Sequence, residues 1–388
     1  MRLPTMLILV LLFAVKPNVI LCDEGSKNMD LPDFWRGKVG DVAEAVEEVK
    51  KGEVEIIARS PGGRNVYLVS YGERDDFASQ ANYNSACGAR NPGYYARKTD
   101  KTKPVVLFVG PVHGQEMEAI VGLVNLIHIA ETGKDLRGKF WKDLADNLSK
   151  CRVLIIPCGN PDGRDRCPLD SFVGVESKTM THYGQGSDKD GDDYGWPGAK
   201  RLHPMRGDVG FLGAYFNDDG INMMHDEFFN PMAEETKAIM RVAQGEAPDY
   251  IPVLHSHGNA PAVLQAAYVP RYIKTGIRKF SHQLADRYEG EELPNHRLPE
   301  PEEDGLKFPP PTFNLTSAIH HVCGGMSFTF ECSHGLKEPE YPQLSHDQIL
   351  DIQLVLYDEL LKFALANPVR WDQDQKSPPG LPRGITFE

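Results

Sequence analysis

Basic residues are scarce relative to acidic ones in this chain of 388 residues. Lys and Arg together number 42 against 55 Asp and Glu, which gives a net charge of −13 and an isoelectric point near 5.5. This imbalance argues against a binding surface for nucleic acids or for anionic membranes. Neutral and cationic partners are compatible with it.

The N-terminal region lacks an apolar run long enough to cross a membrane. The run from Met6 to Val15 follows a short basic start and is too short to span a bilayer. This pattern is typical of a secretory signal, so residues 1–22 are predicted to be cleaved and the mature protein to be secreted, without stable insertion in a membrane. A lipid anchor at Cys22 is the alternative, although Ile20 and Leu21 are not the small residues that such a site prefers.

The sequence has no Cys-x-x-Cys pair, so its cysteines are poor candidates for metal ligands. Seven cysteines are present, and Cys22 lies at the predicted cleavage point. In a secreted protein the remaining even number can pair in disulfides, in a pattern that their spacing does not define. These are Cys87, Cys151, Cys158, Cys167, Cys323 and Cys332.

The chain does contain enough apolar residues, 41% of the total, for a sizeable α/β core. Two buried strands, 105–109 and 151–157, are separated by a helical pattern at 114–131. This order implies a right-handed crossover, and we expect a mixed, mainly parallel sheet with helices on both faces. Further strands are predicted at 54–58, 65–71, 250–254 and 326–332, and further helices at 39–51, 232–244, 273–288 and 345–366.

The predicted organisation is a lead-in at 23–37, one catalytic domain at 38–367 and a loose tail at 368–388. Residues 74–100 and 164–212 are polar and rich in glycine, and both are predicted to be extended loops.

A half-site for a metal stands where the strand 105–109 ends. His113 follows the strand, and Glu116 is expected in the first turn of the next helix. An imidazole and a carboxylate brought together in this way are ligands that zinc accepts. A third ligand must come from another strand end, where His255 and His257 both qualify; they lie two residues apart on an extended segment and project to the same side, so geometry alone does not choose between them.

A zinc hydrolase also needs a general base, and Glu331 is the candidate. It shares one face of the strand 326–332 with Ser327 and Thr329, and that polar face can line a cleft. Neighbouring Phe328 and Phe330 would raise the pKa of this carboxylate toward neutrality, which suits proton transfer.

Four segments occur in the order and approximate spacing of zinc metallocarboxypeptidases of the carboxypeptidase A and B family: His113-Gly114-Gln115-Glu116, Asn160-Pro161-Asp162-Gly163, His255-Ser256 and Ser327 to Glu331. The chain resembles that family over about residues 40–366.

The resemblance implies one zinc ion, held by His113, Glu116 and His255, and a zinc-activated water with Glu331 as general base. It makes His257 a wall of the substrate pocket. It also implies that Arg201 polarises the scissile carbonyl, with Arg206 as a second candidate.

The chain departs from the family at Asn217-Asp218, where the family has Asn-Arg to bind the carboxylate of the substrate's C-terminus. The family's second-shell Asp is Tyr215 here, and its substrate-capping tyrosine has no clear counterpart, although His320 or His321 occupies a similar place in the sequence.

An anion at position 218 would repel a free carboxylate. We therefore expect a secreted zinc peptidase that acts on a peptide or amide with a neutral or cationic end. A conventional carboxypeptidase that uses Arg206 for the carboxylate is a second hypothesis. A catalytically decayed zinc-binding or ligand-binding module of the same fold is the third.

Overall fold

The computed structural model describes residues 31–300 and 308–371. The chain divides into two units, Met1–Leu31 and Pro32–Glu388, and only the second is described here in structural terms. The predicted signal at 1–22, most of the lead-in and most of the tail therefore lie outside the described residues. Within the described ranges, no helix combines the length and the apolar character that a membrane span requires.

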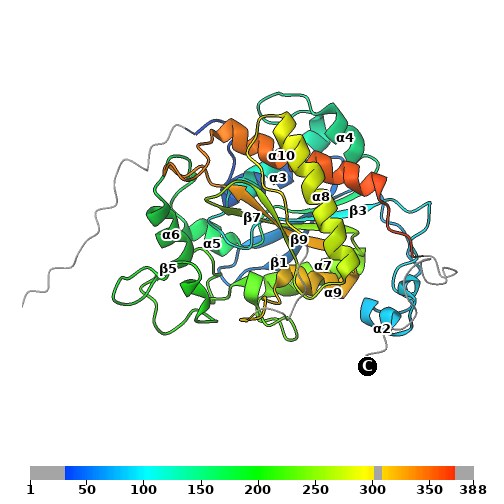
Figure 1. The fold of residues 1–388 in the computed structure, drawn as a ribbon, viewed down its shortest axis with the longest axis horizontal. Helices are drawn as coiled ribbons and strands as arrows, with labels where there is room; N and C mark the ends of the chain where they lie inside the picture. Colours follow the sequence, from blue (N-terminus) through cyan, green and yellow to red (C-terminus); the bar gives the residue numbers. More distant parts are fainter. Residues whose placement is uncertain (1–30, 301–307, 372–388) are drawn as a thin grey trace, which may run out of the picture. The chain divides into compact units, whose positions relative to one another are not determined.

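A seven-stranded sheet in the order β1-β2-β4-β3-β7-β9-β8 forms the centre of the domain (Figure 1). The four inner strands β4, β3, β7 and β9 run parallel, and β1, β2 and β8 are antiparallel to their neighbours. The predicted mixed sheet with a mainly parallel centre is confirmed. The strands are β1 Glu53–Arg59, β2 Asn65–Tyr71, β3 Val105–Val109, β4 Arg152–Ile156, β7 Tyr250–His257, β8 Ala262–Gln265 and β9 Met326–Ser333.

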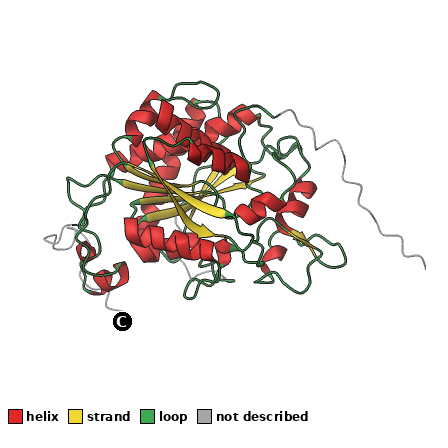
Figure 2. Cartoon of the chain, turned by 180° about the vertical axis from the view of Figure 1, so that it is seen from behind, coloured by secondary structure: helices red, strands yellow, loops and turns green. Residues whose placement is uncertain are grey.

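Helices cover both faces of this sheet, as predicted (Figures 1 and 2). On one face, α10 packs against α3, α4 and α8, and α1 packs against α3; on the other face, α7 packs against α9. The helices of the first face are α1 Val39–Glu47, α3 Glu118–Thr132, α4 Lys142–Leu148, α8 Arg271–Gly290 and α10 His346–Ala366; those of the second are α7 Glu234–Glu246 and α9 Leu315–Cys323.

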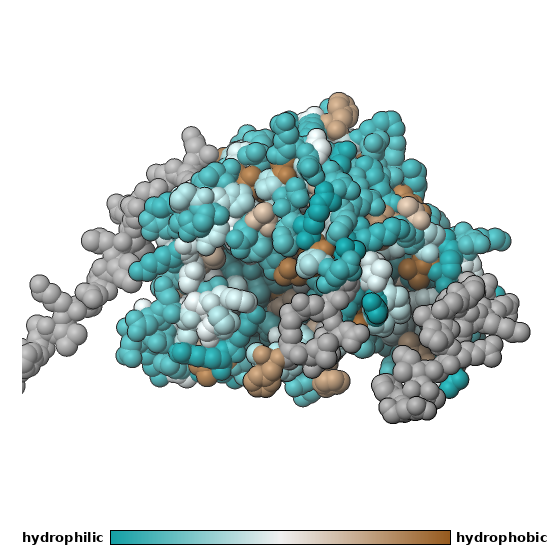
Figure 3. All heavy atoms as spheres, in the orientation of Figure 1, coloured by the Kyte–Doolittle hydropathy of each residue, from teal (hydrophilic) through white to brown (hydrophobic). Residues whose placement is uncertain are grey.

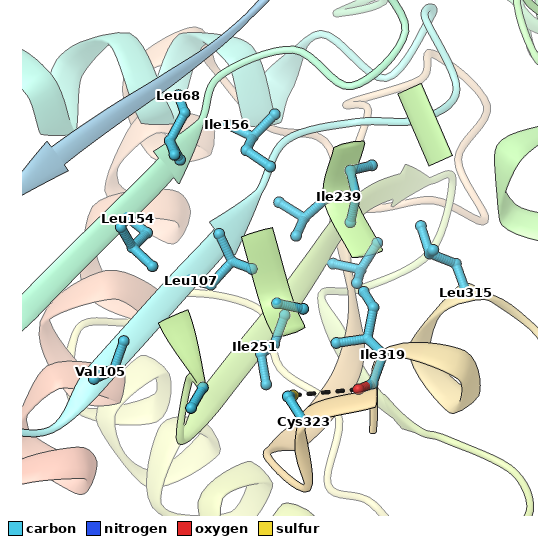
Figure 4. Close-up of a cluster of buried hydrophobic side chains, with 14 of the residues drawn as sticks. Leu68, Val105, Leu107, Leu154, Ile156, Ile239, Ile251, Leu315, Ile319 and Cys323 are labelled. Carbon is cyan, nitrogen blue, oxygen red and sulfur yellow. Dashed lines mark hydrogen bonds between the residues drawn. The ribbon is translucent and has the colours of Figure 1, made fainter. Parts of the chain in front are cut away.

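The strand β3 is apolar at every position, and both of its faces are buried. Leu107 and its β3 neighbours on the same face join a buried cluster with Ile239 of α7 and Ile319 of α9 (Figure 4). Phe108 points to the opposite face, where its ring meets Tyr357 of α10 at a centroid distance of 5.0 Å. A strand buried on both faces needs apolar residues at consecutive positions. On the face seen in Figure 3 the surface is mostly hydrophilic, with hydrophobic side chains in small groups.

The structure corrects the start of one helix. The helix α3 begins at Glu118, not at residue 114, so Glu116 precedes the helix. The backbone at Gly114 lies against the chain that follows β4, since a Cβ atom there would lie 2.0 Å from the backbone nitrogen of Arg164. The segment 113–116 is therefore a tight turn pressed against the chain that follows β4.

Both regions predicted to be extended loops contain secondary structure. Residues 74–100 include α2 Tyr83–Gly88. Residues 164–212 include the helix α6 Ser177–Gln185 and a small ladder of β5 Gly186–Ser187 with β6 Phe211–Leu212, and the helix α5 Pro161–Arg166 reaches into the same region. The sequence of α6 has few apolar residues, so helical periodicity could not reveal it.

The structure shows no disulfide among the cysteines that it describes, so the pairing that a secreted protein permits is not seen there. All six are free; Cys87 is exposed, and the other five are buried. Cys323, for example, lies in the apolar cluster and donates its thiol hydrogen to the carbonyl of Ile319 at 3.2 Å. A buried free cysteine behaves as a small hydrophobic side chain.

Candidate metal centre

The predicted ligands meet at the carboxyl ends of the parallel strands, where α/β sheets place their ligand sites. His113 follows the end of β3, and His255 lies near the end of β7. Neighbouring strand β9 pairs Glu331 with His255, so the side chains of both residues point to the same face of the sheet.

His113, Glu116 and His255 form a compact buried cluster. The Nδ1 atom of His113 lies 2.9 Å from Oε1 of Glu116, and Nδ1 of His255 lies 2.8 Å from Oε2 of Glu116. The two Nδ1 atoms are 3.2 Å apart. All ligand atoms of the group lie within 4.8 Å of one another, so this part of the predicted ligand set does come together.

The chemistry of these atoms fits a cation. His113 Nε2 lies 3.2 Å from the side-chain oxygen of Asn222, which can only accept a hydrogen bond, so the proton is on Nε2 and Nδ1 carries a lone pair. The oxygen Oε2 of Glu116 is buried and accepts no hydrogen bond of normal geometry. Two imidazole nitrogens and a carboxylate are the donor set of a catalytic zinc site.

The charges in the cluster keep the carboxylate ionised. Burial alone would raise the pKa of Glu116, but its interactions with His113 and His255 outweigh burial and lower it to about 2. An ionised carboxylate is the form that binds a metal.

Two neighbours restrain His113. The ring of Tyr215 stacks on the imidazole at a centroid distance of 3.9 Å and an interplanar angle of 13°. Asn222 holds the far nitrogen of the same ring. Tyr215, which stands at the position predicted to correspond to a second-shell Asp, thus contacts His113 through its ring. The polar contact to His113 comes from Asn222, which no sequence motif indicated.

Glu331 has the properties expected of a proton carrier. It is partly buried, and burial raises its pKa to about 7, with His255 acting in the opposite direction and Glu116 raising it further. Behind it, a fully buried pair joins His334, which follows β9, to Glu118 of α3, with Nδ1 2.9 Å from the carboxylate. The charge of His334 lowers the pKa of Glu331.

Two neighbouring exposed basic residues, Lys200 and the predicted Arg201, lie in the same loop, and the carboxylates of the cluster act on Lys200. The guanidinium of Arg201 is exposed and lies over the ring of Tyr194 at 4.8 Å. Lys200 lies over the ring of Trp196 at 5.1 Å, and the carboxylates of Glu331 and Glu116 act on its ammonium group. Burial lowers the pKa of Lys200, and both carboxylates oppose that effect. The two basic residues are adjacent in sequence, so only the loop geometry distinguishes them.

A second basic side chain, His225, interacts with Lys200 and with both ligand histidines. Burial lowers its pKa to about 3, and the charges of Lys200 and the two ligand histidines lower it further. Its imidazole is therefore neutral at physiological pH. Sequence analysis missed this residue because no neighbouring motif marks it.

The structure does not bring the predicted substrate residues Asn217, Asp218 and Arg206 into contact with the ligands. Asn217 is fully buried and is occupied by hydrogen bonds within its own turn and to Glu235. The carboxylate of Asp218 is bound by Arg64 and Arg166. Arg206 is exposed and pairs with Asp219 at 3.8 Å.

His257 lies on β7, two residues after the ligand His255. Its Nε2 atom lies 2.9 Å from the carbonyl of Ala260, and its pKa responds to Glu116. His320 and His321 are the candidates for the position of the substrate-capping tyrosine, and both bond to backbone carbonyls. His320 Nδ1 lies 2.9 Å from the carbonyl of Gly325, and His321 Nε2 lies 2.9 Å from that of Tyr268.

The motif Asn160-Pro161-Asp162-Gly163 has a structural role. The side-chain amide of Asn160 donates to the carbonyls of Val112 and Ala214, at 3.1 and 3.2 Å, and so fixes the chain that leads into His113. Asp162 is buried and accepts from the backbone nitrogens of Gly62 and Asp218 and from Arg64. The motif joins the β1–β2 turn to the loop beside the centre.

Comparison with known proteins supports the fold. No protein-family model matches the sequence, and no curated protein matches it. Among solved structures, a metallo-carboxypeptidase from Burkholderia cenocepacia superimposes with a TM-score of 0.51 at 14% identity, over 84% of this chain and 68% of that one. Thrombin-activatable fibrinolysis inhibitor gives a TM-score of 0.51 at 11% identity, over 85% of this chain and 74% of that one. The chain therefore has a zinc carboxypeptidase-like fold.

Proposed function

We propose that this protein is a zinc-dependent peptidase that hydrolyses a peptide or amide bond with Glu331 as general base. The observation that carries the proposal is the convergence of His113, Glu116 and His255 beside the paired position of Glu331. The fold of the structural neighbours agrees with this proposal, since one of them is a metallo-carboxypeptidase.

The proposed chemistry divides between the ligands and Glu331. A single zinc ion held by the two Nδ1 atoms and Glu116 would supply a Lewis acid for the attacking water and the substrate carbonyl. Glu331 takes the proton of the attacking water on its carboxylate and then delivers it to the leaving amine. A pKa of about 7 suits both transfers, because it allows the group to bind and release a proton near neutrality.

Lys200 has the position expected of the cation that stabilises negative charge in the reaction. Its side chain is exposed, and the carboxylates of Glu331 and Glu116 act on its ammonium group. A fixed cation beside a developing oxyanion stabilises the transition state more than the ground state. We therefore assign to Lys200 the role that the sequence resemblance gave to Arg201.

The charged residues around the centre also bear on which C-terminus the substrate has. The expectation of a neutral or cationic end rested on Asp218, whose charge is taken up by Arg64 and Arg166. With the positive charge of Lys200 acting on the centre, we propose that the enzyme accepts a peptide with a free C-terminal carboxylate. Peptides that differ only in C-terminal amidation test this choice, because amidation should abolish cleavage.

Secretion is part of the proposal and rests on the predicted signal at 1–22. N-terminal sequencing of the exported protein tests it. A new N-terminus near residue 23 supports export with cleavage, and an intact Met1 contradicts it.

The test of the enzymatic proposal is turnover of purified mature protein. Zinc chelation should abolish hydrolysis, and zinc should restore it. Stoichiometric zinc without cleavage of any peptide, free or amidated, would instead identify a binding module with this fold and would refute the proposed activity.

A further inference from the structure

We propose that Asn222 is the positioning residue of the metal centre: it orients His113 toward the metal and, as a neutral amide, sets the zinc affinity below the value that a carboxylate would give. The inference rests on the zinc site of the proposed function. It concerns a residue in the loop after β6, remote in sequence from every ligand.

The hydrogen bonds of Asn222 define which atom faces the ligand. Its Oδ1 atom lies 3.2 Å from His113 Nε2 and also accepts the backbone N–H of Met224 at 3.0 Å. The second bond requires an acceptor, so the amide oxygen, not the NH₂ group, faces the imidazole. The proton of His113 must then be on Nε2, which leaves the Nδ1 lone pair directed at Glu116 and His255.

The surroundings hold Asn222 in place. The side chain is only 2% exposed, and its backbone N–H donates to Nε2 of His203 at 3.0 Å. Asn217 closes the turn that precedes it. The backbone N–H of Asn217 donates to the carbonyl of Ile221 at 3.0 Å, and its side-chain oxygen accepts the backbone N–H of Ile221, also at 3.0 Å. The buried Asn217 thus supports Asn222, a role that differs from the predicted contact with substrate.

The neutral character of Asn222 has a consequence for the metal. A carboxylate draws the imidazole proton more strongly than an amide oxygen does and so makes the opposite ring nitrogen a better donor to a metal. The amide makes His113 a weaker ligand. The side-chain nitrogen of Asn222 is buried without a hydrogen-bond partner, so no contact is lost if an oxygen replaces it.

The charge balance around the centre agrees with a neutral residue. Glu116 and Glu331 already place two carboxylates beside His255, and Lys200 is the cation that acts on both. A third buried carboxylate would be compensated only when a metal cation is bound. Replacing Asn222 by Asp should therefore favour the loaded state over the metal-free state.

The experiment measures zinc affinity by competition with a chromophoric chelator for wild type, Asn222→Leu and Asn222→Asp. Asn222→Leu should bind zinc about 10- to 100-fold more weakly, and Asn222→Asp about 10-fold more tightly. The visible spectrum of the Co²⁺-loaded proteins provides a second readout, since a reoriented imidazole should change the ligand-field bands of Asn222→Leu. Both readouts are independent of activity.

A matched control separates positioning from general destabilisation. Asn125 of α3 is also fully buried, and its side chain bonds only backbone groups of Phe34, Val121 and Leu136. Asn125→Leu should lower the thermal midpoint of the metal-free protein but leave the zinc affinity of the folded protein unchanged.

Equal zinc affinity of wild type and both Asn222 variants would overturn the inference while leaving the proposed function intact. If Asn222→Leu does not fold, Asn222→Asp decides, and an unchanged or weaker affinity then contradicts the inference. The predicted shifts in a protein without peptidase activity would support the inference and refute the proposed function. A wild type that binds no zinc would overturn both.

Discussion

His255 and Glu331 occupy paired positions on the neighbouring parallel strands β7 and β9. This register places the proposed third zinc ligand and the proposed general base side by side on neighbouring strands. Both residues are fixed by the backbone ladder, and only the turn that carries His113 and Glu116 must fold to complete the site. The pairing explains how groups 76 residues apart in the chain are held together without a disulfide or a loop contact.

Glu331→Gln should abolish peptidase activity but retain zinc. The amide keeps the size of the side chain and cannot take a proton from water, so kcat/KM should fall by about 10²- to 10⁴-fold. Zinc content by atomic absorption should remain one ion per chain. The exposed Glu55 of β1 provides the control, since Glu55→Gln should leave both quantities unchanged. Full activity of Glu331→Gln would exclude it as the base.

Lys200→Met should lower kcat/KM by about 10²-fold, because the positive charge proposed to act on the developing oxyanion would be lost. Arg201→Met should have a much smaller effect, since its guanidinium stacks on Tyr194. Steady-state kinetics of both variants on one peptide compares them directly. The opposite ranking would restore the assignment that the sequence resemblance implied.

Glu235→Gln should change how stability depends on pH. Glu235 is fully buried, and burial raises the pKa of its carboxyl from the ordinary value of 4.5 to about 7 in the folded protein. Because the pKa is higher in the folded protein than in the unfolded chain, the protonated form of Glu235 stabilises the folded state. This stabilisation is complete below 4.5, the ordinary pKa, and is lost as the pH rises through 7. Relative to wild type, Glu235→Gln should therefore gain on the order of 2 kcal/mol between pH 5 and pH 8.

Chemical denaturation at the two pH values measures that gain. Glu234 is the neighbouring residue on α7 and pairs at the surface with Lys237 at 2.7 Å. Glu234→Gln should show no comparable difference between pH 5 and pH 8. The same pH dependence in wild type and Glu235→Gln would mean that Glu235 does not titrate in this range.

Asp162→Ala should destabilise the fold more than it affects chemistry. Its buried carboxylate accepts from Ser60, Gly62 and Arg64, and its loss leaves these donors without their partner. We expect a loss of about 2–4 kcal/mol in the free energy of unfolding. Urea denaturation measures it, and a loss below 1 kcal/mol would contradict the structural role of this motif.

The sequence allowed the sheet and the ligands to be predicted because the determinants are local. The apolar run of β3 ends at Gly110-Pro111, and His113 follows that end; His255 and Glu331 likewise follow or end apolar strands. Parallel strands bring such ends together whatever the intervening sequence.

The remainder depends on contacts that the sequence does not display. Lys200 and Arg201 are chemically alike, and only the packing of Trp196 and Tyr194 decides which cation meets the carboxylates. Asn222 acts through a turn closed by Asn217, and neither residue has a spacing that signals a metal site. The even number of cysteines permits disulfides in a secreted protein, whereas the six cysteines that the structure describes are free and five of them are buried.

The most direct measurement is hydrolysis of peptides with a free C-terminus by the purified protein before zinc chelation, after it, and after zinc is added back. The account predicts cleavage that disappears with the chelator and returns with one equivalent of zinc. Stoichiometric zinc binding without any cleavage, or cleavage that persists after complete removal of zinc, would contradict it.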